Sequence, residues 1–217
     1  MATFGWPEMF FIFRSAGWTL LLTVVAFGIG SLLGGALAIM RLSQSRILRA
    51  MASTYILVIQ SIPVLMVLFR SYYGLSLFGI ELPSFFAASA SLAIYASAYL
   101  AEIWRGSIES VPFQQWEASS SLALSRPQQY RYVILPQAVR ISLPPTVGFL
   151  VQLVKNTSIV SVVGFVELSR AGTLVNNATF KPFQVFTVVA AIYFLICFPL
   201  SRLSRHLEKV MNAGRNH

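Results

Sequence analysis

The sequence carries little charge for its length. Only 11% of its 217 residues are charged, and only 7 residues are acidic. Because a soluble domain has about 25% charged residues, this composition argues against a soluble fold. Cysteine is scarce as well. The single Cys197 excludes an internal disulfide bond, and its place in an apolar run predicts a small buried side chain.

Three functional patterns are also missing. The chain contains no Gly-x-x-x-x-Gly-Lys-Ser/Thr sequence and therefore no P-loop for ATP. His206 and His217 have no Cys, Asp or Glu at metal-ligand spacing. The net charge is +9, yet no basic helix with interleaved aromatic residues lies outside the apolar runs, which excludes nucleic-acid binding. We expect no catalytic residue, metal or cofactor in this chain.

Long apolar runs dominate what is present. Hydrophobic residues make up 56% of the chain, and the mean hydropathy is +0.70. A helix that crosses a membrane needs about 20 mostly apolar residues. We interpret five stretches as crossing helices: 16–40, 51–74, 84–104, 139–155 and 183–203. The sequence thus predicts an all-α integral membrane protein with about five transmembrane helices in one domain, residues 1–217.

Two smaller features accompany these runs. The apolar stretch 158–166 is too short to cross and is expected to be re-entrant or partly buried. Four glycines in the first stretch are expected to allow close helix contacts: Gly28, Gly30, Gly34 and Gly35.

A polar block at residues 110–136 separates the third and fourth apolar stretches. This region, the 41–49 loop and the C-terminal tail hold most of the 16 Lys and Arg residues. Loops rich in Lys and Arg stay on the cytoplasmic side of a membrane. Five crossings place all three regions on that side, so the N-terminus is expected outside and the C-terminus in the cytoplasm.

Within the block, the pattern predicts a helix, a tight turn and a second helix. Pro112 suits the first turn of a helix over 114–124. Ser125 and Gln128 have the spacing of a capping box, which would start the second helix. Pro136 is expected to end or kink that helix, and Pro144 and Pro145 to bend the next span. Trp116, Leu122 and Leu124 offer apolar contacts; an amphipathic hairpin resting on lipid or on the bundle is an equally open interpretation.

Polar residues inside the apolar stretches are candidates for a solute path, because such residues are costly in a membrane. Ser91, Tyr95, Tyr99 and Glu102 share one face of a helix. The two tyrosines either line the path or anchor packing, and Glu102 is expected to pair with Arg105. Further candidates are Gln60, Arg70, Gln152, Asn156 and Thr157.

Three charged positions have simpler interpretations. Arg70 is expected to extend outward to the interface, although a pore-facing Arg70 would hold a substrate carboxylate. Lys155 is expected to be an interfacial anchor, with a hinge or gate role left open. Glu167 and Arg170 have the spacing of a solvated ion pair on an outer loop.

Several segments resemble permease subunits of binding-protein-dependent ABC importers. Glu117-Ala118, followed by Ile134-Leu135-Pro136, is similar to the cytoplasmic EAA loop of that family. Ser119 stands where the EAA pattern has its second Ala, and Ala123 stands where the pattern has Gly. The Ile134-Leu135-Pro136 end is one residue shorter than the family pattern. Four segments resemble the polar amino-acid branch of this family more specifically: AYLAEIWRG (98–106), QWEA (115–118), LPQA (135–138) and KNTS (155–158). The last of them replaces the KDTS that is usual in the branch.

The resemblance implies a type I ABC importer-like permease fold in a bacterial cytoplasmic (inner) membrane. Two permease subunits, identical or homologous, would form the path within the lipid, two ATP-binding cassette subunits would hydrolyse ATP, and an extracytoplasmic solute-binding protein would deliver the solute. A cytoplasmic coupling loop at about 106–136 would contact the ATPase. The coupling residues it implies are Trp116, Glu117, Ala118, Ala123, Leu135 and Pro136. The implied cargo is a polar amino acid, whether basic, acidic or amide.

Two other classes stay open at this point. An ion-coupled secondary transporter of a small polar solute often has internal repeats and intramembrane acids, whereas this chain has no clear repeat and only Glu102 as an acid within a span. A membrane-embedded enzyme would need a convergent nucleophile, base or metal set. An ATPase that purifies with the chain would distinguish an ABC subunit from both.

Overall fold

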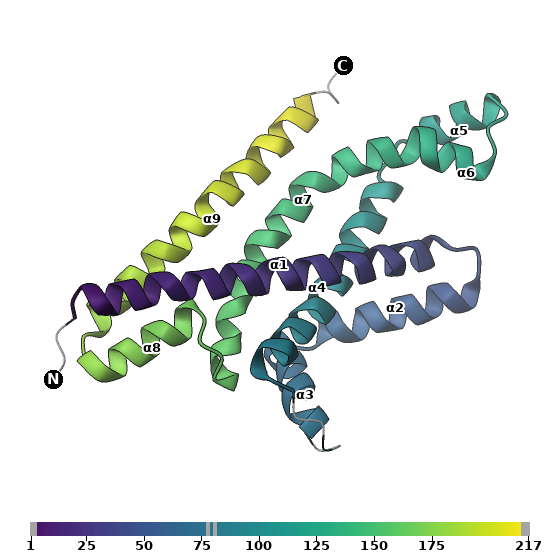
Figure 1. The fold of residues 1–217 in the computed structure, drawn as a ribbon. Coiled ribbons are helices and arrows are strands. Elements are labelled where there is room, and N and C mark those ends of the chain that lie inside the picture. Colours follow the sequence, from purple (N-terminus) through teal and green to yellow (C-terminus); the bar gives the residue numbers. More distant parts are fainter. Residues whose placement is uncertain (1–3, 77–78, 80–81, 214–217) are drawn as a thin grey trace.

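The computed structural model describes residues 4–76, 79 and 82–213, with side chains for all of these except 75, 76, 212 and 213. The described part is helical, with no strand in it (Figure 1). Its elements are α1 (Trp6–Leu42), α2 (Arg46–Ser61), α3 (Val64–Ser76), α4 (Ser84–Glu109), α5 (Phe113–Ser121), α6 (Arg126–Gln128), a π-helical segment (Gln129–Ile134), α7 (Leu135–Asn156), a 3₁₀ segment (Thr157–Val163), α8 (Leu168–Thr179) and α9 (Pro182–Ala213).

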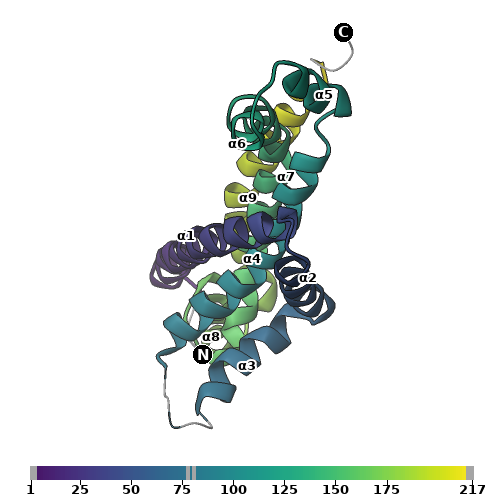
Figure 2. The ribbon, with the colours of Figure 1, turned by 90° about the vertical axis from the view of Figure 1, so that its right-hand side faces the viewer.

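Helix α4 forms the centre of the bundle. It is rich in Ala and Ser, and these small side chains let α1, α2, α3 and α7 pack closely around it (Figure 2). The largest apolar cluster joins Leu92 and Leu100 of α4 to Leu22 of α1, Leu68 of α3 and Phe149 of α7. Four separate segments of the chain therefore share one core.

Two glycines set the close approach of α1 to α4. A Cβ on Gly30 would lie 2.6 Å from the Cβ of Ala96, and one on Gly34 would lie 3.0 Å from the carbonyl oxygen of Ser97. The expected role in helix contact is thus confirmed for these two. It is wrong for Gly28, since no atom of another described residue lies within 4 Å of its Cβ position. Gly35 is only in ordinary contact with Trp104.

This difference gives a matched pair of variants. Gly30→Ala is expected to destabilise the α1–α4 contact by about 1–3 kcal/mol, the usual range for overpacking. Gly28→Ala adds the same methyl group where there is room and is expected to be neutral or slightly stabilising, because alanine favours helix. Thermal unfolding of the two purified variants in the same detergent measures the difference. Equal midpoints for both would contradict the packing argument.

The stretch predicted as one span over 51–74 is broken in two. Helix α2 ends at Ser61, and α3 begins at Val64, at 102° to α2. The cause lies at Pro63, because a residue before proline is disfavoured in helical geometry, and Ile62 is extended (φ −107°, ψ 134°). Within the described residues, four single helices are long and apolar enough to cross a membrane, and the bent pair makes up to five, as predicted.

The fourth span differs from its predicted bounds. A continuous helical stretch runs from Arg126 to Val163 through Pro136, Pro144 and Pro145. Pro136 was expected to end or kink the helix and does not end it. It follows the π-helical segment, whose wider turn gives room for the proline ring. Figure 1 shows the ribbon curving within α7, in the way expected of Pro144 and Pro145.

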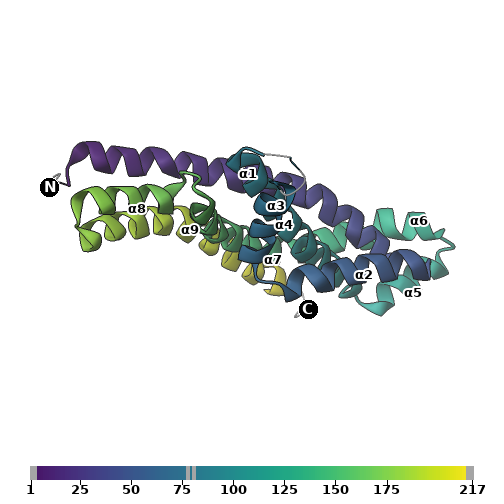
Figure 3. The ribbon, with the colours of Figure 1, turned by 90° about the horizontal axis from the view of Figure 1, so that it is seen from below.

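The outer part of this region carries a helix that the sequence interpretation missed. The short stretch at 158–166 is partly buried, as expected, and lies mainly in the 3₁₀ segment, where Val160 and Val163 are buried. Helix α8 follows it and lies beside α1 and α9 (Figure 3). Helix α1 begins at Trp6 rather than near residue 16, and its 37 residues extend about 55 Å.

Candidate coupling surface and membrane path

The polar block folds into a hairpin at one end of the molecule, the end that also holds the last turns of α9 (Figure 2). Helix α5 starts after Pro112, as predicted, and ends three residues earlier than predicted, at Ser121. Ala123 then takes a left-handed conformation with φ 56°, where glycine is favoured and another residue is strained. The capping box is confirmed, since Ser125 and Gln128 bond to each other at the start of α6.

Hydrogen bonds and a ring contact hold the two arms of this hairpin together. Gln129 is buried, and its amide nitrogen donates to the carbonyl oxygen of Leu124 at 2.8 Å and to the Ser120 hydroxyl at 3.2 Å. Trp116 meets Tyr130 edge to face, with ring centroids 5.1 Å apart. The half-buried Trp116 ring thus packs on the cluster that contains Ile134, and it also lines the hollow on the outer side of the hairpin.

The outward face of the hairpin carries different side chains. Phe113 is 70% exposed and Leu122 is 73% exposed, and Glu117 and Ala118 are exposed between them. A hollow of about 800 Å³ is lined by Glu109, Phe113, Glu117 and Arg126, among others. Of the expected coupling residues, Glu117, Ala118 and Ala123 lie in the exposed hairpin, whereas Leu135 and Pro136 begin α7. Phe113 was not among the predicted residues.

An ion network joins the helix before the hairpin to the first two helices. Glu102 pairs with Arg105 at 2.6 Å, as predicted, and also accepts from Nε of Arg41 at 3.2 Å. Arg105 also pairs with Glu109, and Arg41 donates to Ser53. The network therefore connects the C-terminal halves of α1 and α4 with α2 next to the hairpin.

A second constellation lies inside the bundle. The rings of Tyr95 and Tyr99 are 4.5 Å apart, and that of Phe149 stacks on Tyr99 at 5.6 Å. Asn156 is buried nearby: its side-chain oxygen accepts from Gln152 at 3.2 Å, and its side-chain nitrogen has no hydrogen-bond partner within the described residues. A buried amide without a hydrogen-bond partner is unusual.

The other path candidates lie apart or are already engaged. Thr157 is buried and donates to the carbonyl oxygen of Val154. Gln60 is exposed on α2 and donates to the carbonyl oxygen of Ala98 at 3.4 Å. Arg70 is exposed on α3, and Ser91 donates to carbonyl oxygens of its own helix. The structure thus brings together four of the predicted candidates: Tyr95, Tyr99, Gln152 and Asn156. Phe149, whose ring packs against both tyrosines, was not predicted.

Glu167 overturns an expectation. It was expected in a solvated ion pair with Arg170, but its side chain is fully buried and forms none of the ion pairs within the described residues. Its carboxylate accepts from the backbone nitrogens of Ser169 and Arg170 at 2.9 and 2.8 Å, and from the hydroxyls of Tyr193 at 3.0 Å and Thr19 at 3.4 Å. Glu167 therefore caps α8 and ties it to α1 and α9.

Comparison with known proteins assigns this arrangement to a family. The model of the family described as "Binding-protein-dependent transport system inner membrane component" matches residues 26–212. The chain belongs to this family. It is therefore an inner-membrane permease subunit of a binding-protein-dependent ABC importer, and nothing in the comparisons supports an ion-coupled transporter.

Individual relatives agree with the family match. The chain is 38% identical over 88% of its length, and 88% of the relative's, to the "Probable glutamine ABC transporter permease protein GlnM" of Bacillus subtilis. It is 35% identical to the "L-cystine transport system permease protein TcyB" of Bacillus subtilis, over 88% of this chain and 82% of that one. A chain of the crystal structure of an amino acid ABC transporter with histidines is 37% identical, with a TM-score of 0.88 over 92% of this chain and 93% of that chain. The expected type I permease fold is confirmed.

Proposed function

We propose that this permease imports a polar amino acid and that α5 carries the motion of separate ATP-binding subunits into the bundle. One observation supports this most: the hairpin exposes Phe113, Glu117 and Leu122, while buried Gln129 and the Trp116–Tyr130 contact hold α5 against the π-helical segment that leads into α7. A short helix fixed in this way transmits a rigid-body motion, whereas a loose loop would absorb it. The printed names of the relatives, which include glutamine and L-cystine, support an amino-acid cargo.

The remaining parts of the assembly follow from this proposal. Two ATP-binding subunits dock on the exposed hairpins of two permeases, identical or homologous, and a binding protein delivers the solute from outside. The hairpin and the C-terminal end of α9 face the cytoplasm, since Arg126, Arg131 and Arg205 lie there in the excess expected on that side. The N-terminus of α1 then lies outside. ATP hydrolysis belongs to the partner subunits, and this chain is not an enzyme.

The solute path runs beside Tyr95, Tyr99 and Asn156. Their aromatic faces and the unpaired amide nitrogen of Asn156 offer packing and a hydrogen-bond donor to a polar solute. Gln152 and Thr157 lie on the same stretch of chain as Asn156. Gln60 and Arg70, exposed on α2 and α3, remain separate candidates. An amide or carboxylate oxygen of an amino acid would accept from Asn156.

Tyr95→Phe tests the path without disturbing the fold. The variant keeps the ring in place and removes only the hydroxyl group, so the initial rate of uptake is expected to fall about 2–10-fold, the equivalent of one hydrogen bond. Tyr73→Phe removes a hydroxyl from a ring that is 53% exposed on α3 and is expected to have no effect. Uptake into proteoliposomes that contain equal amounts of each complex measures the rates. An unchanged rate in Tyr95→Phe would remove Tyr95 from the path.

The proposed function has its own direct test. The tagged chain, purified from its native membrane, is expected to bring an ATP-binding subunit with it. The reconstituted complex, with its binding protein, is expected to accumulate one or more labelled amino acids from a panel of basic, acidic and amide types, only when ATP is inside. Accumulation driven by a proton or sodium gradient without nucleotide would refute the proposal.

A further inference from the structure

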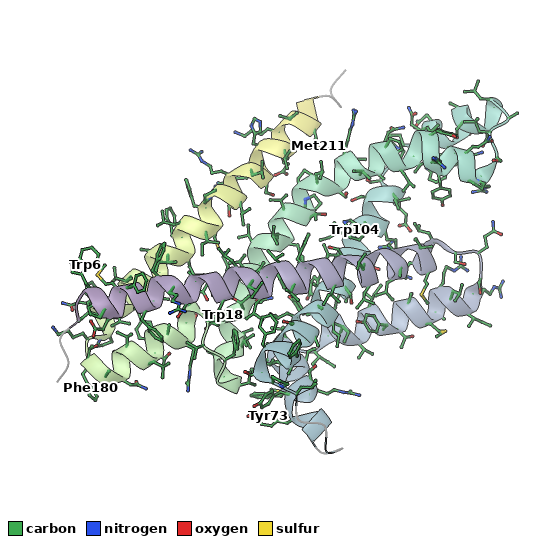
Figure 4. All side chains as sticks on the ribbon, in the orientation of Figure 1. Trp6, Trp18, Tyr73, Trp104, Phe180 and Met211 are labelled. Carbon is green, nitrogen blue, oxygen red and sulfur yellow. The ribbon has the colours of Figure 1, made fainter. Side chains whose placement is uncertain are left out.

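A groove of about 680 Å³ opens between α7 and α9, at the same end of the molecule as the coupling hairpin. Figure 4 labels Met211, one of its lining residues, near the end of α9. The groove is mostly apolar, with a few polar groups of both charges. Its lining includes Gln137, Arg140, Ile141, Ser204, Glu208 and Met211. This size and mixture are typical of a site for a small molecule.

Its two charged residues are opposite in sign. Arg140 comes from α7 and Glu208 from α9, and neither forms an ion pair within the described part of the chain. A guanidinium group binds a carboxylate through two parallel hydrogen bonds, and a carboxylate binds an ammonium group. An α-amino acid carries both partners within one small molecule. The apolar lining from Ile141 and Met211 suits its carbon atoms.

The groove is also connected to the coupling helix. The amide nitrogen of Gln137 donates to the Gln115 side chain of α5 at 3.2 Å and to the carbonyl oxygen of Val133 at 2.9 Å. Its amide oxygen makes none of the hydrogen bonds found among the described residues. A ligand that donates to this oxygen is therefore connected to α5 through the Gln137 side chain alone.

We propose that this groove is a second amino-acid site, separate from the path at Tyr95 and Asn156, that binds the imported zwitterion on the cytoplasmic side and slows further import. The proposal rests on the proposed amino-acid import. A ligand that bridges Arg140 and Glu208 holds α7 and α9 in their present arrangement. It thereby favours this arrangement over any in which the two helices have moved relative to each other. Product inside the cell would thus lower the rate of transport.

The test is uptake against a rising internal concentration of product. Proteoliposomes contain the full transporter and ATP, receive labelled L-glutamine with the binding protein outside, and are preloaded with unlabelled L-glutamine. The wild-type rate is expected to fall at least about twofold as internal glutamine rises. Arg140→Gln removes the guanidinium that binds the carboxylate, and Glu208→Gln removes the charge that binds the ammonium group. Each variant is expected to weaken this inhibition at least about tenfold. Lys209→Gln, an exposed neighbour outside the groove, is the control and is expected to behave as wild type.

The outcomes separate this inference from the proposed function. Uptake without internal glutamine tests the importer, and only its dependence on internal glutamine tests the groove. Equal inhibition in all variants, or none in the wild type, would overturn the groove site. If no uptake occurs, the groove site is tested by binding of labelled L-glutamine to the purified complex without binding protein. Binding that survives Asn156→Ala and is lost in Glu208→Gln supports the site. A rate that responds to anionic lipid instead of glutamine would assign the groove to lipid headgroups.

Discussion

Replacing Glu117 by lysine is expected to stop ATP-driven uptake while the permease stays folded. Glu117 is exposed on the outward face of α5, and its side chain forms none of the hydrogen bonds or ion pairs found in the described residues. The change therefore leaves the bundle intact and acts only on a docked partner. A reversed charge in such an interface costs several kcal/mol, enough to lower the fraction of docked complex more than about tenfold.

Three measurements on the same preparation distinguish coupling from other defects. These are the amount of permease in the membrane, the ATP-binding subunit that purifies with it, and the initial rate of uptake. Gln44→Lys introduces the same side chain into the exposed loop between α1 and α2, on the same side of the membrane, and is expected to retain uptake. The initial rate of uptake of Glu117→Gln should lie between those of the wild type and Glu117→Lys. A normal rate in Glu117→Lys, at equal expression, would show that α5 does not couple through this face.

Local signals in the sequence predicted the hairpin well. The capping box at Ser125 and Gln128 depends on residues three positions apart, and Pro112 marks the start of α5. The break at Pro63 has an equally local signal, since proline disfavours helix at the residue before it, but the hydropathy of the whole stretch favours a single span. The direction of Trp116 was not predictable in this way, because it depends on Tyr130 across the turn.

The cluster of aromatic and amide side chains inside the bundle was predicted only in part, for a related reason. Spacing of three and four residues placed Tyr95 and Tyr99 on one face of α4. Asn156 was also a candidate, but it lies with Phe149 on α7, and no pattern within one helix indicates which helix will pack against it. Phe149 was therefore missed. Helix α8 was missed because it is too short and too polar to be read as a membrane span.

Glu167 is the clearest case of tertiary structure overriding local spacing, and its removal is expected to have the largest effect on stability. Arg170 is three residues away, which favours an ion pair, yet the carboxylate is bound by Thr19, 148 positions away, and by Tyr193. Burial raises the pKa of the Glu167 carboxyl, and the backbone donors of Ser169 and Arg170 oppose this. Glu167→Ala leaves two hydroxyls and two backbone N–H groups without their acceptor.

The expected loss in Glu167→Ala is about 3–5 kcal/mol, because several donors lose their acceptor and each buried donor left unsatisfied costs about 1–3 kcal/mol. Glu167→Gln keeps one acceptor oxygen for the backbone of α8 and is expected to lose less, because it resembles the protonated carboxyl that burial favours. Glu208→Ala removes an exposed carboxylate and should change stability by less than about 0.5 kcal/mol. Thermal unfolding of the purified complexes ranks the three variants. If Glu167→Ala unfolds at the wild-type temperature, the carboxylate does not hold α8 against α1 and α9, and the joint must depend on the apolar contacts of Leu168 and Val185 instead.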